Sequence, residues 1–238
     1  MMRRVIASEF IKIRRSMIWF LAVLGPLGVV GLQALNYTLR YDYLTRKYAS
    51  DLWGRLIMDV QFLAVPALLM GITVIASMIA GIEHRTNAWK QTLALPVTRA
   101  SVFAAKFFVL AFLLLFSSTL LVLGTAALGA ALNFGVNPIP YQQLLIRSYF
   151  PYLAAMPFVA LQTWLSVVVK NQSIPLTVGL LGAVLSPFAS VMNDWLPLKW
   201  PLLLNEWNEP LYSAAAGIVT GALVYLAGMA NFIGKDVK

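Results

Sequence analysis

Residues 83–99 carry the polar side chains best suited to function in this chain, and they read EHRTNAWKQTLALPVTR. The segment supports one short helix, in which Trp89 and Leu93 lie one turn apart on the same edge and Pro96 ends the helix. Thr98 can then cap the helix that follows. A stiff helix on short connections between two long elements is suited to docking a partner and transmitting force.

The sequence contains no complete set of residues for catalysis, metal binding or nucleotide binding. There is no cysteine, which excludes thiol nucleophiles and thiolate ligands, and the lone histidine, His84, cannot build a histidine metal site. No serine–histidine–aspartate set falls within the apolar stretches. No GxxxxGK[ST] phosphate loop occurs, so ATP would have to be bound by a separate subunit. We therefore expect neither an enzyme nor a cofactor in this chain.

The elements that position residues 83–99 are long apolar stretches. The 238-residue chain is 60% hydrophobic and 11% charged, with a mean hydropathy of +0.78, whereas soluble domains are about 25% charged. A bilayer span needs about 20 apolar residues, and a helix satisfies its own backbone groups in lipid. Six stretches qualify, and none contains Asp, Glu, Lys, Arg or His: residues 17–35, 60–82, 107–132, 149–169, 174–192 and 211–233. We predict one all-α polytopic domain over residues 1–238.

Charged residues divide unequally between the two sides of this predicted path. Of the 18 lysines and arginines, twelve lie on the side that holds both termini and six on the other, whereas the nine acids divide three to six. The positive-inside rule therefore places both termini in the cytoplasm. The net charge of +9 is therefore explained by the orientation of the chain in the membrane, and no nucleic-acid partner is expected. The exception is the segment between the first two spans, which carries Arg40, Arg46, Lys47 and Arg55.

Residues 1–16 are predicted to form a basic amphipathic helix in the cytoplasmic interface. Apolar residues recur there at helical spacing, and charged residues surround them. The charged residues proposed to act in this interfacial helix are Glu9, Lys12, Arg14 and Arg15. The helix could anchor the chain to anionic lipid or brace a partner subunit, and these two roles are compatible.

An outer segment, residues 193–210, reads NDWLPLKWPLLLNEWNEP. Its tryptophans fit an interfacial aromatic belt. The alternative is a lid or contact surface for an amphiphilic ligand, with Trp195, Trp200, Glu206, Trp207 and Glu209 as candidate substrate contacts. The composition suggests a re-entrant or surface-lying helix.

Prolines and glycines predict how the spans bend and pack. Pro151 and Pro157 fall in the fourth span and predict a kink there. Gly217 and Gly221 form a GxxxG pattern, which allows close helix packing, more readily within the subunit than between subunits.

Two segments together resemble a known family. Residues 81–107, GIEHRTNAWKQTLALPVTRASVFAAKF, resemble the loop of ABC-type-2 exporter permeases of the lantibiotic-immunity and bacitracin-resistance branch, and residues 8–16, SEFIKIRRS, resemble the start of that family. The resemblance implies that residues 83–96 form a coupling helix that docks on an ATP-binding subunit. It implies that Glu83 lies at the membrane edge, that Trp89 and Lys90 face the ATPase, and that Arg99 anchors the exit of the loop. The remaining residues that it assigns to coupling are His84, Arg85 and Pro96.

The function that the resemblance implies is export of an amphiphilic peptide antibiotic from a bacterial plasma membrane. ATP and Mg²⁺ would be bound by the partner ATPase, expected in two copies, beside a second permease that is identical or related. Membrane lipid is the remaining expected partner.

Three other classes of protein compete with this interpretation. A secondary transporter commonly has ionisable residues within the bilayer, and the predicted spans contain none. A membrane enzyme would lack a catalytic set. A non-transporting scaffold or sensor, which binds a cytoplasmic protein through residues 83–99, stays the main alternative. The identity of the loop's partner discriminates it from a permease.

Overall fold

The computed structural model describes residues 2–86, 97–134 and 139–234, and every regular element in these ranges is a helix. The elements are α1 (Met2–Ile13), α2 (Ile18–Leu39), α3 (Tyr41–Lys47), α4 (Leu52–Thr86), α6 (Arg99–Ala131), α7 (Tyr141–Ala154), α8 (Met156–Val168), α9 (Ser173–Leu185), the 3-10 helices η1 (Ser186–Val191) and η2 (Trp200–Leu202), and α10 (Pro210–Gly234). The predicted all-α fold is confirmed.

Six segments of the described chain are long and apolar enough to cross a membrane, and each overlaps one predicted span. They are Ile18–Leu39, Leu52–His84, Arg99–Ala131, Tyr141–Val168, Ser173–Val191 and Pro210–Gly234. Several of the helices extend beyond the predicted ranges. The ranges themselves contain no Asp, Glu, Lys, Arg or His, but the longer helices include Glu83, Lys106 and Arg147.

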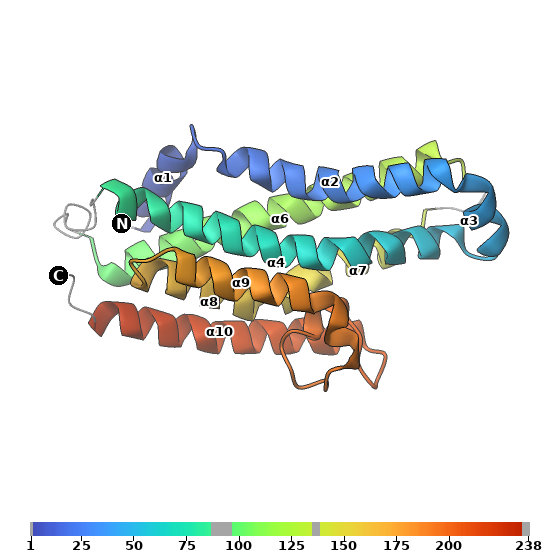
Figure 1. Ribbon diagram of the computed structural model, residues 1–238. Coiled ribbons are helices and arrows are strands. Elements are labelled where there is room, and N and C mark those ends of the chain that lie inside the picture. The colour runs from blue at the N-terminus through green and yellow to red at the C-terminus, as the bar shows by residue number, and fades with distance from the viewer. Residues whose placement is uncertain (1, 87–96, 135–138, 235–238) are drawn as a thin grey trace.

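The long helices run along one common axis (Figure 1). The helix α1 and the last turn of α10 lie at one end of the bundle, here called the α1 end, together with the start of α6. The helix α3 lies at the opposite end, called the α3 end. An even number of spans requires this arrangement, since each span reverses the direction of the chain.

The fourth span is broken in the middle, as its prolines predict. The helix α7 ends at Ala154 and α8 begins at Met156, with Pro157 in the first turn of α8, where its missing N–H is tolerated. The helix α10 packs against this break. A Cβ added to Gly217 would lie 2.4 Å from the Cα of Ala154, and one added to Gly221 would lie 2.6 Å from the Cβ of Met156. The predicted packing within the subunit is confirmed.

Residues 193–209 do not form the predicted re-entrant or surface-lying helix. This stretch is described in full, and it holds turns and the three-residue η2. Leu203 ends η2 with a left-handed backbone, φ 58°, and Asn208 has φ 53°. Pro197 and Pro201 supply no backbone N–H, so a regular helical ladder cannot run through the segment.

Candidate functional site

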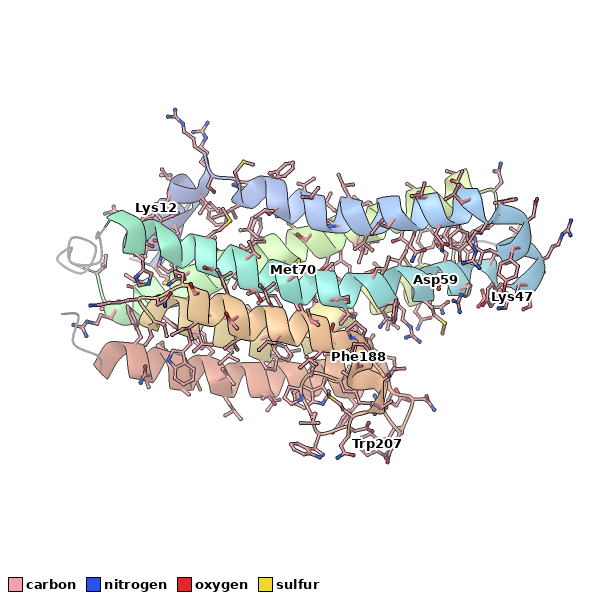
Figure 2. All side chains as sticks on the ribbon, in the orientation of Figure 1. Lys12, Lys47, Asp59, Met70, Phe188 and Trp207 are labelled. Atoms are coloured by element: carbon pink, nitrogen blue, oxygen red, sulfur yellow. The ribbon has the colours of Figure 1, made fainter. Side chains whose placement is uncertain are left out.

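Four charged side chains from three helices meet at the α1 end. Glu9 and Lys12 come from α1, Glu83 from the last turns of α4, and Lys106 from the second turn of α6. We call this set the ionic ring. Figure 2 labels Lys12 at the junction of α1 and the end of α4.

Each lysine in the ionic ring contacts both glutamates. The Nζ of Lys12 lies 2.5 Å from Glu9 Oε1 and 2.8 Å from Glu83 Oε1. The Nζ of Lys106 lies 2.9 Å from Glu9 Oε2 and 2.8 Å from Glu83 Oε2. Every carboxylate oxygen therefore has one ammonium partner, and the four groups form a closed, neutral cycle.

Three of the four side chains in the ionic ring are buried. The side chains of Lys106 and Glu83 are each 1% exposed and that of Glu9 is 3% exposed, whereas Lys12 covers the rim at 30%. Charges so deeply buried are stable only when they are paired and hydrogen-bonded. The set is therefore a joint that holds α1, α4 and α6 in one arrangement.

The sequence of α1 explains why its charges face inward. Val5, Glu9 and Ile13 are spaced four residues apart and form the buried stripe of the helix. Val5 packs in one cluster with Val102 and Ala105 of α6, which brings Glu9 opposite Lys106.

Lys12 keeps its charge in this setting. Burial lowers the pKa of Lys12, but hydrogen bonds to Glu83 and Glu9 and their negative charges outweigh it, so that the pKa is raised above its ordinary value of 10.5. The ring therefore stays closed at neutral pH.

The ionic ring joins the two helices that flank residues 83–99, since it includes one residue near the end of α4 and one near the start of α6. Glu83 lies three residues before the end of α4, and Lys106 lies seven residues after the start of α6. At the start of α6, the Thr98 side chain accepts a hydrogen bond from Ser101 N at 3.2 Å, which confirms the predicted cap. The Arg99 guanidinium donates to the carbonyl of Ile233 in α10 at 3.0 Å.

The other predicted coupling residues are placed only in part. His84 is directed into the bundle, with Nε2 3.0 Å from the carbonyl of Ser166 in α8. Trp89, Lys90 and Pro96, and the side chain of Arg85, lie outside the described residues.

The sequence pattern places Glu9 and Lys12 in one region and Glu83 in another. It identifies Lys106 only as one of the twelve lysines and arginines on the side of the termini. The available signal was a lone lysine in the apolar run Phe103–Val109, which needs a carboxylate partner if it is buried. Arg14 and Arg15 of the predicted interfacial set are exposed and lie outside the ring.

The predicted substrate contacts near the α3 end are of two kinds. Trp195 and Trp207 are 68% and 59% exposed, and Figure 2 shows Trp207 at the edge of its loop. Glu206 and Glu209 are exposed as well. Trp200, by contrast, is 7% exposed, and its Nε1 donates to the carbonyl of Asp194 at 2.6 Å. The structure places Trp200 in the core and the other four on the surface.

Asp194 holds this loop together. Its carboxylate lies 2.6 Å from the Nζ of Lys199 and accepts the backbone N–H of Glu206 at 2.8 Å. The hydrogen bond from Lys199, followed by that from Glu206, lowers the pKa of Asp194 below its ordinary value. The exposed tryptophans are thus carried on an ordered loop.

Comparison with known families gives one match. The family model described as ABC-2 family transporter protein matches residues 5–186, which is more than half of the chain and includes all four residues of the ionic ring. A search of curated proteins gives no match.

Proposed function

Because this chain belongs to the ABC-2 family of transporter proteins, and is therefore a multi-pass membrane permease of an ATP-binding-cassette transporter, we propose that it exports an amphiphilic peptide antibiotic of the lantibiotic or bacitracin type. The likeness of residues 8–16 and 81–107 to that branch supports this substrate class. Export would protect the producing or resistant cell.

The energy for export comes from a partner. Membership of the family implies an ATP-binding subunit, and the loop of residues 83–99 is its docking site in our proposal. Two copies of that subunit, which bind ATP and Mg²⁺, assemble with two permeases, identical or related. The α1 end faces the cytoplasm in this arrangement.

The four basic residues near the α3 end are compatible with that orientation. The guanidinium carbon of Arg40 lies 5.0 Å from the ring centre of Tyr43, Lys47 Nζ lies 5.3 Å from the same ring, and the guanidinium carbon of Arg55 lies 4.5 Å from the ring centre of Tyr48. These cation–π contacts hold three of the four charges against aromatic rings of the protein.

The ionic ring is the observation that carries the proposed mechanism. A push on the loop reaches the ends of α4 and α6, which the ring holds together and joins to α1. The helix α4 is 35 residues long and continuous to the α3 end, with Pro66 inside it. Force applied at the loop therefore moves three helices as one unit, and α4 transmits the movement across the membrane.

A pull-down tests the assembly. The tagged chain is purified from native membranes in mild detergent, and the co-purifying proteins are identified by mass spectrometry. We expect a stoichiometric subunit with a phosphate loop, and a second permease gene product if the pair is unlike. Recovery of the chain alone, or with a partner that cannot bind ATP, would contradict the proposal and favour the scaffold or sensor.

The coupling role is tested by Trp89→Ala, with Tyr141→Ala as the control. Tyr141 is an aromatic residue in the first turn of α7, is 64% exposed and lies outside the predicted coupling and substrate contacts. The first change is expected to abolish substrate-stimulated ATP hydrolysis and peptide resistance while the protein still inserts in the membrane. The control is expected to keep ATP hydrolysis coupled. Full resistance in cells that carry Trp89→Ala would exclude the loop as the coupling element.

A further inference from the structure

A half-open cavity of about 60 Å³ lies midway along the bundle, where α2, α4, α6 and α7 contact one another. Its walls are mostly apolar, and its polar groups come from one arginine and three serines. Since a cavity of about 10–15 Å³ already holds a water molecule, this one has room for a compact polar group. None of the residues assigned to coupling lines it.

Arg147 of α7 is the charged group of the cavity. Its guanidinium donates to Gln61 Oε1 at 3.0 Å, and the Gln61 amide donates in turn to the carbonyl of Leu202 at 3.0 Å. Within the described residues, Arg147 forms no ion pair with a carboxylate. A cation inside a membrane-spanning segment is costly and needs a partner, and here only a neutral amide supplies one.

Two serine side chains add unused donors. Ser118 of α6 and Ser148 of α7 are each 6% exposed and line the cavity. Neither hydroxyl forms a hydrogen bond to any part of the chain that the structure describes, whereas the neighbouring Ser117 donates to the carbonyl of Ala22 at 2.6 Å. Buried polar side chains are nearly always hydrogen-bonded. A guanidinium and two hydroxyl groups together match a group rich in acceptors.

The cavity also has space beside these donors. A Cβ added to Gly25 would meet no atom within 4 Å, and one added to Gly71 would meet only Leu114, at 4.0 Å. Leu21, Leu68 and Leu121 line the apolar walls. The site thus combines a small cationic pole with a hydrocarbon surface.

We propose that this cavity binds the anionic head, a carboxylate or a phosphate, of an amphiphile whose apolar part lies against the leucines. Arg147 forms the ion pair, and Ser118 and Ser148 donate hydrogen bonds. The ligand is either an acidic group of the exported molecule or an anionic lipid, which share this chemistry. Binding is a property of the permease itself, so its failure would leave the proposed export function untouched.

The test is equilibrium binding to the full chain, with the partners that co-purify, in nanodiscs of neutral phosphatidylcholine. The probes are radiolabelled tetradecanoate and tetradecyl phosphate, with tetradecanol as the uncharged control. We expect saturable binding of one acid per chain and no saturable binding of the alcohol. Equal binding of acid and alcohol would overturn the proposal.

Variants locate the binding. Arg147→Gln is expected to weaken tetradecanoate binding at least about tenfold, since hydrogen bonds to charged groups are worth about 1.5–3 kcal/mol, and Arg147→Lys is expected to restore part of it. Arg55→Gln is the matched control, because Arg55 already pairs with Asp59 at 2.7 Å. Gly71→Leu keeps Arg147 but fills the cavity, and should also abolish binding. Unchanged affinity in both Arg147→Gln and Gly71→Leu would exclude the site.

A competition arm separates the two sources. If phosphatidylglycerol in the nanodisc displaces the labelled acid, the natural ligand is lipid. If the exported peptide displaces the labelled acid only when its acidic group is intact, the ligand is the substrate. Displacement by neither would contradict the proposal.

Discussion

The ionic ring and the cavity around Arg147 both hold cations inside the bundle, but the two cations meet opposite partners. The Nζ of Lys106 lies within 2.9 Å of two carboxylates, and the four charges of the ring cancel. Arg147 has one amide oxygen at 3.0 Å, and the hydroxyl groups of Ser118 and Ser148, which line the same cavity, form no hydrogen bond within the described residues. A closed set of charges indicates a permanent joint, whereas an open set indicates a place that something else completes.

The largest expected effect comes from opening the ring. Lys106→Met leaves Glu9 and Glu83 buried with only Lys12 to neutralise them, and removal of one partner from a buried pair costs about 3–5 kcal/mol. We expect a large fall in the melting temperature of the purified protein in detergent. The double variant Glu83→Leu with Lys106→Met removes both charges and leaves Glu9 paired to Lys12, so it should recover most of the loss. Equal damage in both variants would show that packing, and not charge pairing, makes the joint.

A second contrast concerns packing. A Cβ at position 217 overlaps the backbone of Ala154, so Gly217→Ala should destabilise the protein by about 1–3 kcal/mol through overpacking. Gly25→Ala at the cavity meets nothing, and it should be neutral or stabilise by up to about 1 kcal/mol, because alanine favours the helix. Thermal unfolding of the two variants measures this. A similar loss in both would mean that the cavity closes in the membrane.

The pH dependence tests the charge pairing of the ionic ring. Because the pKa of Lys12 is raised above 10.5, the stabilisation it contributes is complete below about pH 10.5 and is lost as the pH rises through the raised value. The difference in melting temperature between the wild type and Lys12→Met should therefore shrink at high pH. A constant difference up to pH 12 would contradict the assignment.

The smallest expected effect on stability distinguishes two adjacent serines of α6, Ser117 and Ser118. Ser117→Ala removes the hydrogen bond to Ala22 in α2 and should cost about 0.5–1.5 kcal/mol. Ser118→Ala removes no hydrogen bond to the part of the chain that the structure describes, and it should leave the stability of the ligand-free protein unchanged. Chemical or thermal unfolding of the pair in the same detergent gives the comparison. A cost at Ser118 equal to that at Ser117 would mean that its hydroxyl already has a partner.

The sequence predicted the helical class, the six spans, the Thr98 cap and the break near Pro157, because hydropathy, caps and prolines act locally. The ring could not be predicted, since Glu9, Glu83 and Lys106 meet only through the packing of three helices. Arg147 was missed because the predicted fourth span began at residue 149, after the last charge, whereas the helix begins at Tyr141. The helix expected in residues 193–210 was wrong because tryptophan content indicates an interface but no backbone geometry.

The ionic ring also determines the order in which parts of the chain can reach their final contacts during synthesis. Glu9 can meet Lys12 as soon as the first turns of the nascent chain form, but Glu83 follows Lys12 by 71 residues and Lys106 follows Glu9 by 97. A ribosome must therefore deliver the start of the third span before the amino-terminal helix is locked in place. Until then α1 carries a carboxylate without its final partner. Synthesis of the start of the third span is thus the step that allows the ionic ring to close and the amino terminus to be fixed in the folded protein.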